Sequence, residues 1–234
     1  MVTYVLIHGA GSDSWYWHRV IPELRARGHE VVAADLPCDD DSAGLSTYAD
    51  VVVDAIGQRH DVVIVAQSLA GFTAPLVCER VPVDLLILVA AMVPTPGESP
   101  RDWWANTGWE RARREQAKHE SRTSDGRFDA MAEFFHDVPV DVVAQALARG
   151  ARTQSNTPFA EPWPLLAWPD VPTRFLLCRD DRFFPAEFMR RVVFKRLGIA
   201  PDEIGGGHLP ALNRPRELVE RLEAYRAGDG SCRA

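Results

Sequence analysis

The chain has 234 residues, which is enough for one large or two small domains, and its 46% of hydrophobic residues can fill a sizeable core. Its formal net charge of −7 argues against a nucleic-acid-binding protein, which would carry a basic face. No apolar run approaches the length of a membrane span.

The first residues enter an apolar segment at once, without a basic start or a cleavage site, so no signal peptide is expected. The four cysteines, Cys38, Cys78, Cys178 and Cys232, lack metal-ligand spacing. We expect them to be reduced thiols in a cytoplasmic protein.

Apolar, β-branched runs recur along the chain with helical stretches between them. Strands are expected at residues 3–7, 30–34, 62–66, 85–90 and 174–178, with a weaker one at 202–204. The first helices are expected at about 15–27, ending before Gly28, and at about 48–58. Strands that are apolar on both faces and alternate with helices predict a mostly parallel, doubly wound α/β sheet.

The alternation stops in residues 94–171, which contain no strand pattern. This segment holds five of the seven tryptophans and two helical patterns, at about 109–120 and 141–149. We expect a helical cap over the C-terminal edge of the sheet, where open α/β sheets bind ligands. The expected division is a core of residues 1–93 and 172–234 and a cap of residues 94–171.

A glycine-rich turn, His8-Gly9-Ala10-Gly11, follows the first strand directly. Glycines there let the backbone turn sharply and leave amides facing the sheet edge, where they could hold an oxyanion. The turn is not a phosphate loop, because neither Gly-Lys-Ser/Thr nor GxGxxG completes it. An ordinary glycine-rich turn is the alternative.

A serine between small residues follows the third strand, in Ala66-Gln67-Ser68-Leu69-Ala70 with Gly71 next. The spacing is that of Gly-x-Ser-x-Gly, in which small flanking residues allow a strand to reverse sharply into a helix. Alanine meets that demand nearly as well as glycine. Ser68 is therefore a candidate nucleophile, and a helix-capping serine is the alternative.

Two later motifs also follow strands. Asp180 and Asp181 come after the strand at 174–178, where an acid could orient a histidine; an Asp- and Pro-rich surface turn is the alternative. Three glycines precede His208, and we expect this flexible run to let the ring swing onto the sheet edge. A structural histidine is the alternative there.

Serine, acid and histidine occur in that order, each just after an expected strand. This pattern resembles the α/β-hydrolase fold, whose triad runs nucleophile, acid, histidine, and the resemblance extends from Tyr4 to about Tyr225. Within that superfamily the chain looks most like the small methylesterase and hydroxynitrile-lyase group. The residues that carry this likeness are Val5-Leu6-Ile7-His8-Gly9-Ala10-Gly11 with Trp15 and Trp17, Ser68-Leu69, Cys178-Arg179-Asp180-Asp181-Arg182, Gly206-Gly207-His208 and Phe134-Phe135-His136-Asp137-Val138-Pro139.

The resemblance implies a role for each motif. Ser68 is the expected nucleophile, His208 the general base and then acid, and Asp181 the residue that orients His208. Asp181 is preferred over Asp180 because it lies four residues before Pro185, as in the common family spacing. The amides of Ala10 and Leu69 would form the oxyanion hole. No metal or cofactor is implied.

Two positions separate the reactions of this group. The lyases carry a threonine after the first histidine and a lysine after the catalytic one, whereas this chain has Gly9 and Leu209. Neither residue can donate a side-chain hydrogen bond or a charge, so ester hydrolysis is favoured over cyanohydrin cleavage. The alternatives are a lyase, lactonase or cyclase step at the same site, and a ligand-binding protein with little turnover.

The cap is expected to set the substrate. Its aromatic side chains could wall a pocket for a small apolar or aromatic group; the candidate pocket residues are Gly9, Trp103, Trp104, Phe134, Phe135, Phe159, Trp163 and Leu209. His136 and Asp137 are attributed to a helix boundary before Pro139, not to a second dyad. The expected partner is a small-molecule substrate, not nucleic acid or a membrane, and a homodimer is left open.

Overall fold

The computed structural model describes residues 1–122 and 128–228, so Cys232 lies outside the described residues. Its six strands form one sheet. The strands are β1 (Thr3–Ile7), β2 (Glu30–Ala34), β3 (Val62–Gln67), β4 (Leu85–Val89), β5 (Thr173–Cys178) and β6 (Asp202–Ile204). All six expected strands are present, and none of their ends differs from expectation by more than one residue.

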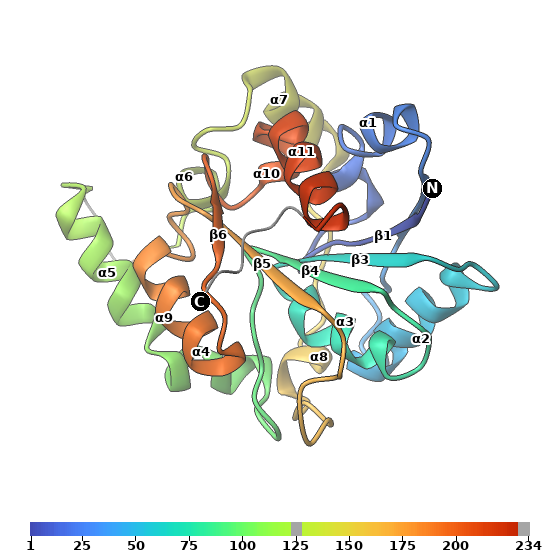
Figure 1. Ribbon diagram of the computed structural model, residues 1–234. Coiled ribbons are helices and arrows are strands. Elements are labelled where there is room, and N and C mark those ends of the chain that lie inside the picture. Colours follow the sequence, from blue (N-terminus) through green and yellow to red (C-terminus); the bar gives the residue numbers. More distant parts are fainter. Residues whose placement is uncertain (123–127, 229–234) are drawn as a thin grey trace.

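Every strand pair is parallel, in the order β2-β1-β3-β4-β5-β6 (Figure 1). All carboxyl ends therefore meet at one edge of the sheet. The loops that carry His8, Ser68, Asp181 and His208 follow β1, β3, β5 and β6, so they share that edge. This is the doubly wound α/β fold expected from the alternation of strands and helices.

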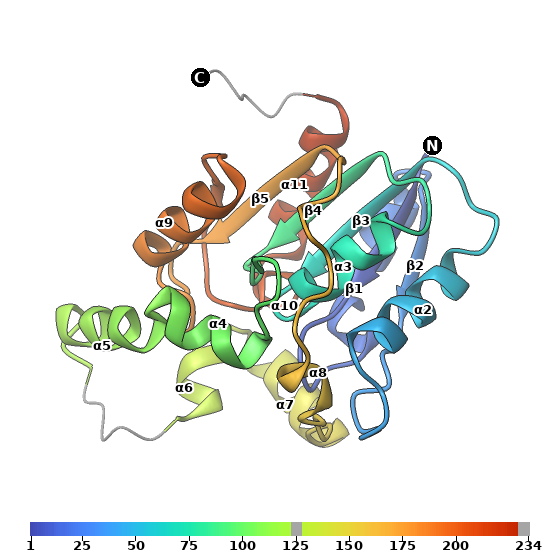
Figure 2. The ribbon, with the colours of Figure 1, turned by 90° about the horizontal axis from the view of Figure 1, so that it is seen from below.

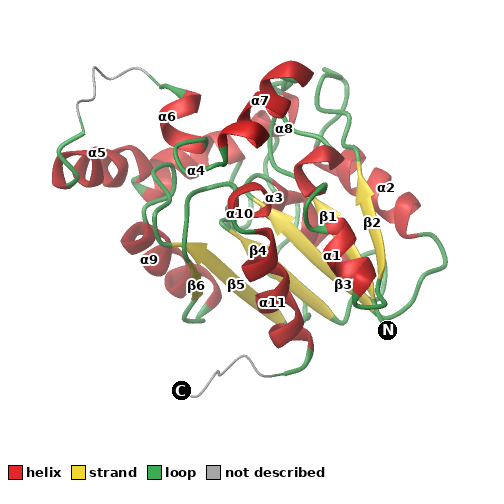
Figure 3. Cartoon of the chain, turned by 90° about the horizontal axis from the view of Figure 1, so that it is seen from above, coloured by secondary structure: helices red, strands yellow, loops and turns green. Residues whose placement is uncertain are grey.

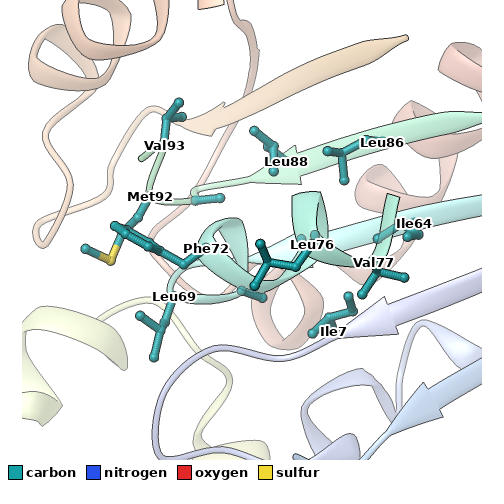
Figure 4. Packing of buried hydrophobic residues seen from close by; sticks show 14 of the residues in the cluster. Ile7, Ile64, Leu69, Phe72, Leu76, Val77, Leu86, Leu88, Met92 and Val93 are labelled. Atoms are coloured by element: carbon teal, nitrogen blue, oxygen red, sulfur yellow. The ribbon is translucent and has the colours of Figure 1, made fainter. Parts of the chain in front are cut away.

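Alternate strand residues point to opposite faces and make two cores. Val5, Ile64 and Leu88 pack on the face covered by α2 (Leu45–Ile56), α3 (Ala70–Cys78) and α9 (Ala186–Leu197). Leu6 and Val65 pack on the other face, with α1 (Ile21–Ala26), α10 (Pro210–Asn213) and α11 (Pro215–Arg226). Figure 4 shows Leu76 and Val77 of α3 beside Ile7 and Ile64 of the sheet.

The single helix expected at about 15–27 is wrong. The segment forms a 3-10 turn, η1 (Ser14–Trp17), and then α1, which begins at Ile21 with Pro22 in its first turn. Proline has no amide hydrogen and its ring collides with the carbonyl four residues earlier in a helix, so it fits only near a helix start. The segment therefore divides before Pro22.

The second expected helix begins earlier than its local pattern indicates. α2 starts at Leu45, whose amide donates to Glu161 Oε2 over 2.7 Å. Glu161 lies 116 residues along the chain and supplies the acceptor that the helix N-terminus needs. A helix-capping residue so distant in the sequence leaves no signal in the residues next to the helix start. The helix ends at Gly57, as its sequence allows.

The described residues between β4 and β5 form five short helices. They are α4 (Pro100–Thr107), α5 (Trp109–His119), α6 (Ala130–Phe134), α7 (Val140–Arg149) and α8 (Thr157–Ala160). Of these, α5 and α7 match the expected helices. Figures 2 and 3 show α4 to α7 beyond the arrowheads of the strands, at the edge that carries Ser68. None of the described helices is both long and apolar enough to cross a membrane.

Candidate active site

Ser68 occupies a strained turn between β3 and α3. Its φ angle is 55°, in the left-handed region that residues with a side chain seldom adopt. The turn is held from both sides: the Ser68 amide donates to Val89 O over 3.3 Å, and its carbonyl accepts from Met92 over 2.9 Å. The hydroxyl group is thereby presented at the end of the strand instead of being turned into the helix.

The small residue that this turn needs most is Gly71. A Cβ atom there would lie 1.9 Å from the carbonyl oxygen of Met92, which belongs to the backbone and has little room to move. Ala66 and Ala70 are buried without difficulty as alanines. The strict glycine of this elbow is thus the third residue after Ser68. Figure 4 shows Leu69, Phe72 and Met92 gathered beyond it.

His208 joins Ser68 to Asp181. Its Nε2 atom lies 3.1 Å from Ser68 Oγ and its Nδ1 atom 2.8 Å from Asp181 Oδ2. Because a carboxylate only accepts, Nδ1 carries the proton and Nε2 is free to accept from the serine hydroxyl. Asp181 Oδ1 accepts from the amides of Phe183 and Phe184, each over 2.8 Å. The carboxylate is therefore fixed at both oxygens while 1% exposed.

Asp180, the competing acid, faces away from the imidazole. Its Oδ2 accepts from the Gly206 amide over 2.8 Å, and its own amide donates to Gly206 O over 3.0 Å. These two hydrogen bonds join the loop after β5, which carries the two aspartates, to the loop after β6, which carries the histidine. The three glycines before His208 are buried, and the amides of Gly206 and Gly207 donate to Asp180 and Asp137.

The turn after β1 lies against the nucleophile. A Cβ on Gly9 would be 2.9 Å from Ser68 Cβ and 2.5 Å from Gln67 Oε1. His8 holds this turn: its Nε2 accepts from the Leu36 amide over 3.1 Å, so Nδ1 donates to Gly9 O over 2.8 Å. Burial lowers the pKa of His8, which favours this neutral form.

The amides expected to bind an oxyanion are those of Ala10 and Leu69. Within residues 1–122 and 128–228, neither amide donates a hydrogen bond to another protein group. Both residues flank Ser68, one across the Gly9 turn and one next to it in the chain. The two N–H groups thus remain free for a ligand atom at the strand ends.

The expected pocket residues separate into two groups. Trp103 and Trp163 are wrong as pocket walls: they are 0% and 1% exposed, and their indole N–H groups donate to Val93 O and Phe72 O. A side chain without surface accessible to water cannot line a cavity that holds substrate. They are core residues, whereas Phe134 lies with its ring 5.2 Å from the imidazole of His208.

The other expected wall residues are partly exposed. Trp104 contacts Phe183 and Phe184 in a cluster of aromatic rings. Phe135 and Leu209 pack on the core beside α11, and Phe159 on the opposite core, so these three contribute to packing around the site.

Sequence reasoning missed two rings that touch the histidine. Phe183 and Phe184 lie 5.1 and 5.0 Å from the imidazole, so with Phe134 they enclose His208 in aromatic surface. The signal was present in the sequence, since the two rings come two and three residues after Asp181.

Other reactive groups do not compete with Ser68. Burial raises the pKa of the Cys78 thiol to about 12, and it also raises the pKa of the Cys178 thiol at the end of β5. Neither is therefore a ready thiolate. Among the described residues, no three His, Cys, Asp or Glu side chains could together hold a metal ion. A depression lined by residues that include Gly57, Arg59 and Asp84 lies at the opposite end of the sheet.

Comparisons with known proteins show which family this chain resembles in sequence and fold. Residues 4–221 match the model of the alpha/beta hydrolase family. The chain is 26% identical to the probable esterase PIR7A of Oryza sativa subsp. indica over 94% of each chain. It is 29% identical to methylesterase 3 of Arabidopsis thaliana over 93% of each chain. The crystal structure of polyneuridine aldehyde esterase superposes with a TM-score of 0.77 at 20% identity, covering 97% of this chain and 99% of that one.

Proposed function

The chain belongs to the alpha/beta hydrolase family and is an ester hydrolase of it, and we propose that it cleaves small carboxylic esters through Ser68, His208 and Asp181. The observation that carries this proposal is the continuous line from Ser68 Oγ through the imidazole to the Asp181 carboxylate, with distances of 3.1 and 2.8 Å. Both contacts are short enough for proton transfer and orientation.

The reaction follows from these contacts. His208 Nε2 takes the hydroxyl proton while Ser68 Oγ attacks the ester carbonyl. The bond from Ser68 to the acyl carbon forms, and negative charge develops on the carbonyl oxygen. The free amides of Ala10 and Leu69 stabilise that charge; one such donor contributes about 3–4 kcal/mol in a comparable hydrolase. Asp181 keeps the proton on Nδ1 and stabilises the imidazolium.

The second half uses the same groups. The imidazolium gives its proton to the alkoxy leaving group, the ester C–O bond breaks, and the alcohol departs. His208 then takes a proton from water as that water attacks the acyl-enzyme carbonyl. The bond from the acyl carbon to Ser68 Oγ breaks, the imidazolium returns its proton to Ser68 Oγ, and the acid is released. No step requires a metal or a cofactor.

The substrate proposed is an ester of a small apolar or aromatic acid. Phe134, Phe183 and Phe184 enclose the imidazole, so the group bound next to it meets apolar ring surface. The relatives named esterase and methylesterase support a small alcohol, such as methanol, as the leaving group. The free thiols of Cys38, Cys78 and Cys178 support a cytoplasmic location.

The second candidate reaction, cyanohydrin cleavage, is opposed by Gly9. A threonine at this position would bring its Cβ within 2.9 Å of Ser68 Cβ. The turn therefore excludes the side chain that the lyases place there.

Two assays test the proposal. A fluorophosphonate probe should label the wild-type protein and the exposed-serine control Ser42→Ala but not Ser68→Ala. The wild type should hydrolyse p-nitrophenyl acetate and leave mandelonitrile intact. Labelling that persists in Ser68→Ala would remove Ser68 as the nucleophile, and fast mandelonitrile cleavage with an inert ester would establish the lyase instead. A wild type that is neither labelled nor active would favour the ligand-binding alternative.

A further inference from the structure

The segment between α6 and α7 reaches the loop that carries His208. Asp137 lies in this segment, and its Oδ2 atom accepts from the Gly207 amide over 2.7 Å. The same oxygen accepts from Asn213 Nδ2 over 2.7 Å, in the helix that follows the loop. One carboxylate oxygen of the cap thus holds the residue immediately before His208 and the last residue of α10.

The side chains of His136 and Asp137 leave no room for a side chain at Gly207. A Cβ there would lie 2.9 Å from Asp137 Oδ1 and 2.7 Å from His136 Nε2. The φ angle of Gly207 is not in the left-handed region, so glycine is required here by crowding and not by backbone conformation. The cap side chains are therefore packed directly onto the backbone of the loop.

The last residue of α6 touches the imidazole itself. The ring of Phe134, three residues before Asp137, lies 5.2 Å from the ring of His208 and at 30° to it. The cap thus contacts the ring of His208 through Phe134 and the preceding residue, Gly207, through Asp137. The core holds the loop from the other side, where Asp180 accepts from Gly206.

We propose that Asp137 is a positioning residue for the reaction: the cap uses its carboxylate to hold Gly207, and through it His208, in register with Ser68 and Asp181. This inference rests on the proposed function of His208 as the general base. Asp137 does not touch the reacting atoms. It fixes the amide of the residue that precedes the base.

The physical reason is that His208 must satisfy two short contacts at once. Its ring spans 3.1 Å to Ser68 Oγ on one side and 2.8 Å to Asp181 Oδ2 on the other. The run of three glycines before it gives the unrestrained loop many backbone conformations. A displacement of about 1 Å in a catalytic group can cost about 100-fold in rate. A hydrogen bond at the adjacent amide removes much of that freedom.

Three variants isolate the role of the carboxylate. Asp137→Ala removes the acceptor, and we expect kcat for p-nitrophenyl acetate to fall about 10- to 100-fold with KM little changed. Asp137→Asn keeps one acceptor oxygen for Gly207, so kcat should stay within about threefold of wild type. Asp141→Ala, an exposed aspartate in the first turn of α7, is the matched control and should leave kcat unchanged.

A spectroscopic readout separates positioning from general stability. The proton shared by His208 Nδ1 and Asp181 should give a low-field proton resonance in wild type and in Asp141→Ala. In Asp137→Ala we expect this resonance to broaden, because the mobile loop exposes the proton to exchange with water. Thermal unfolding, measured in parallel, shows whether the fold is retained.

A double-mutant cycle extends the test to a variant with a smaller perturbation. Asn213→Ala removes one donor from the same oxygen and should lower kcat less than Asp137→Ala does. The double variant should lose no more than Asp137→Ala alone, because the two residues act through one contact. Additive losses would mean that they act independently and would overturn the proposal.

Two further outcomes would also overturn it. One is an Asp137→Ala protein with wild-type kcat and an unchanged low-field resonance. The other is an equal loss in Asp137→Asn, which would assign the effect to charge and not to the hydrogen bond. Failure of the proposed function looks different: the wild type itself would show neither Ser68 labelling nor ester turnover, while the resonance would still report on the loop.

Discussion

At the scale of single residues, the strained turn at Ser68 depends on close packing of the residues around it. The left-handed backbone at Ser68 brings the first turn of α3 against the segment after β4, so that Gly71 meets the carbonyl of Met92. Ala66 and Ala70, by contrast, are buried in the hydrophobic core as alanines. The residue at position 71 is thus more restricted than the residues at positions 66 and 70, which are the two glycine positions of the Gly-x-Ser-x-Gly motif.

Gly71→Ala should therefore damage both the fold and the site. The added methyl group would lie 1.9 Å from Met92 O, and overpacking against backbone costs about 1–3 kcal/mol or more. We expect the free energy of unfolding in urea to fall by at least about 2 kcal/mol. The control is Ala70→Gly, which should cost about 1 kcal/mol or less as a glycine in a helix. Equal stabilities for Gly71→Ala and wild type would contradict this explanation.

The two neighbouring aspartates should differ in their effect on rate. Asp181→Asn disturbs the partner of His208 Nδ1, and the corresponding change in a serine protease lowers kcat by about 10⁴. Asp180→Asn keeps an acceptor for the Gly206 amide, so a loss of about tenfold or less is expected. Steady-state ester hydrolysis measures both. A larger loss in Asp180→Asn would reverse the assignment of the acid.

At the scale of elements, the cap contacts three of the loops that carry site residues. Gln116 in α5 donates to the carbonyl of Asp181 over 3.3 Å, and Asp137 accepts from Gly207 over 2.7 Å. Gln154, between α7 and α8, accepts from the Gly11 amide over 2.9 Å. The acid, the base and the glycine turn after β1 are therefore each tied to a different part of the cap.

Gln154→Ala tests the contact to the glycine turn. Loss of the acceptor frees the Gly11 amide and loosens the backbone that carries Ala10, so we expect kcat to fall about tenfold with little change in KM. The matched control is Gln145→Ala, an exposed glutamine in α7. The measurement is kcat for the hydrolysis of p-nitrophenyl acetate by each variant. Similar kcat values for the two variants would show that the turn holds its shape without the cap.

Sequence predicted the elements of the sheet better than those of the cap. β-branched runs are local and strong, so all six strands were found, and the order of Ser68, Asp181 and His208 located the candidate site. The start of α2 depends on Glu161, and the burial of Trp103 and Trp163 depends on carbonyls in Val93 and Phe72. Such long-range contacts leave no periodic signal. The aromatic enclosure of His208 has the same origin, because Phe134 comes from the cap.

At the scale of the whole molecule, the C-terminal helix is joined to the sheet by a carboxylate. Glu223 in α11 accepts from the hydroxyl of Tyr4 in β1 over 2.6 Å and lies 3.0 Å from His29 Nε2. Its burial alone would raise its pKa, but hydrogen bonds from Arg226, Tyr4 and His29 outweigh this and lower the pKa to about 2. The pairing joins residues 219 positions apart, so it stabilises the whole fold.

This pairing makes stability sensitive to acid. A lowered pKa in the folded state means that Glu223 contributes stability above its ordinary pKa of 4.5, and that this contribution is lost as pH falls toward about 2. Glu223→Gln should therefore be less stable than wild type at pH 7, and the difference should shrink between about pH 4.5 and 2. Urea unfolding at several pH values measures it, with the exposed Glu220→Gln as control. A difference independent of pH would contradict this role.

The most direct test of the central claim is to trap the acyl-enzyme. The wild-type protein is quenched in acid while it turns over p-nitrophenyl acetate, digested, and its peptides are weighed by mass spectrometry. We expect one acetyl group, on the peptide that contains Ser68, and none in Ser68→Ala. An acetyl group on another residue, or undiminished ester hydrolysis by Ser68→Ala, would contradict the proposal that Ser68, His208 and Asp181 carry out the reaction.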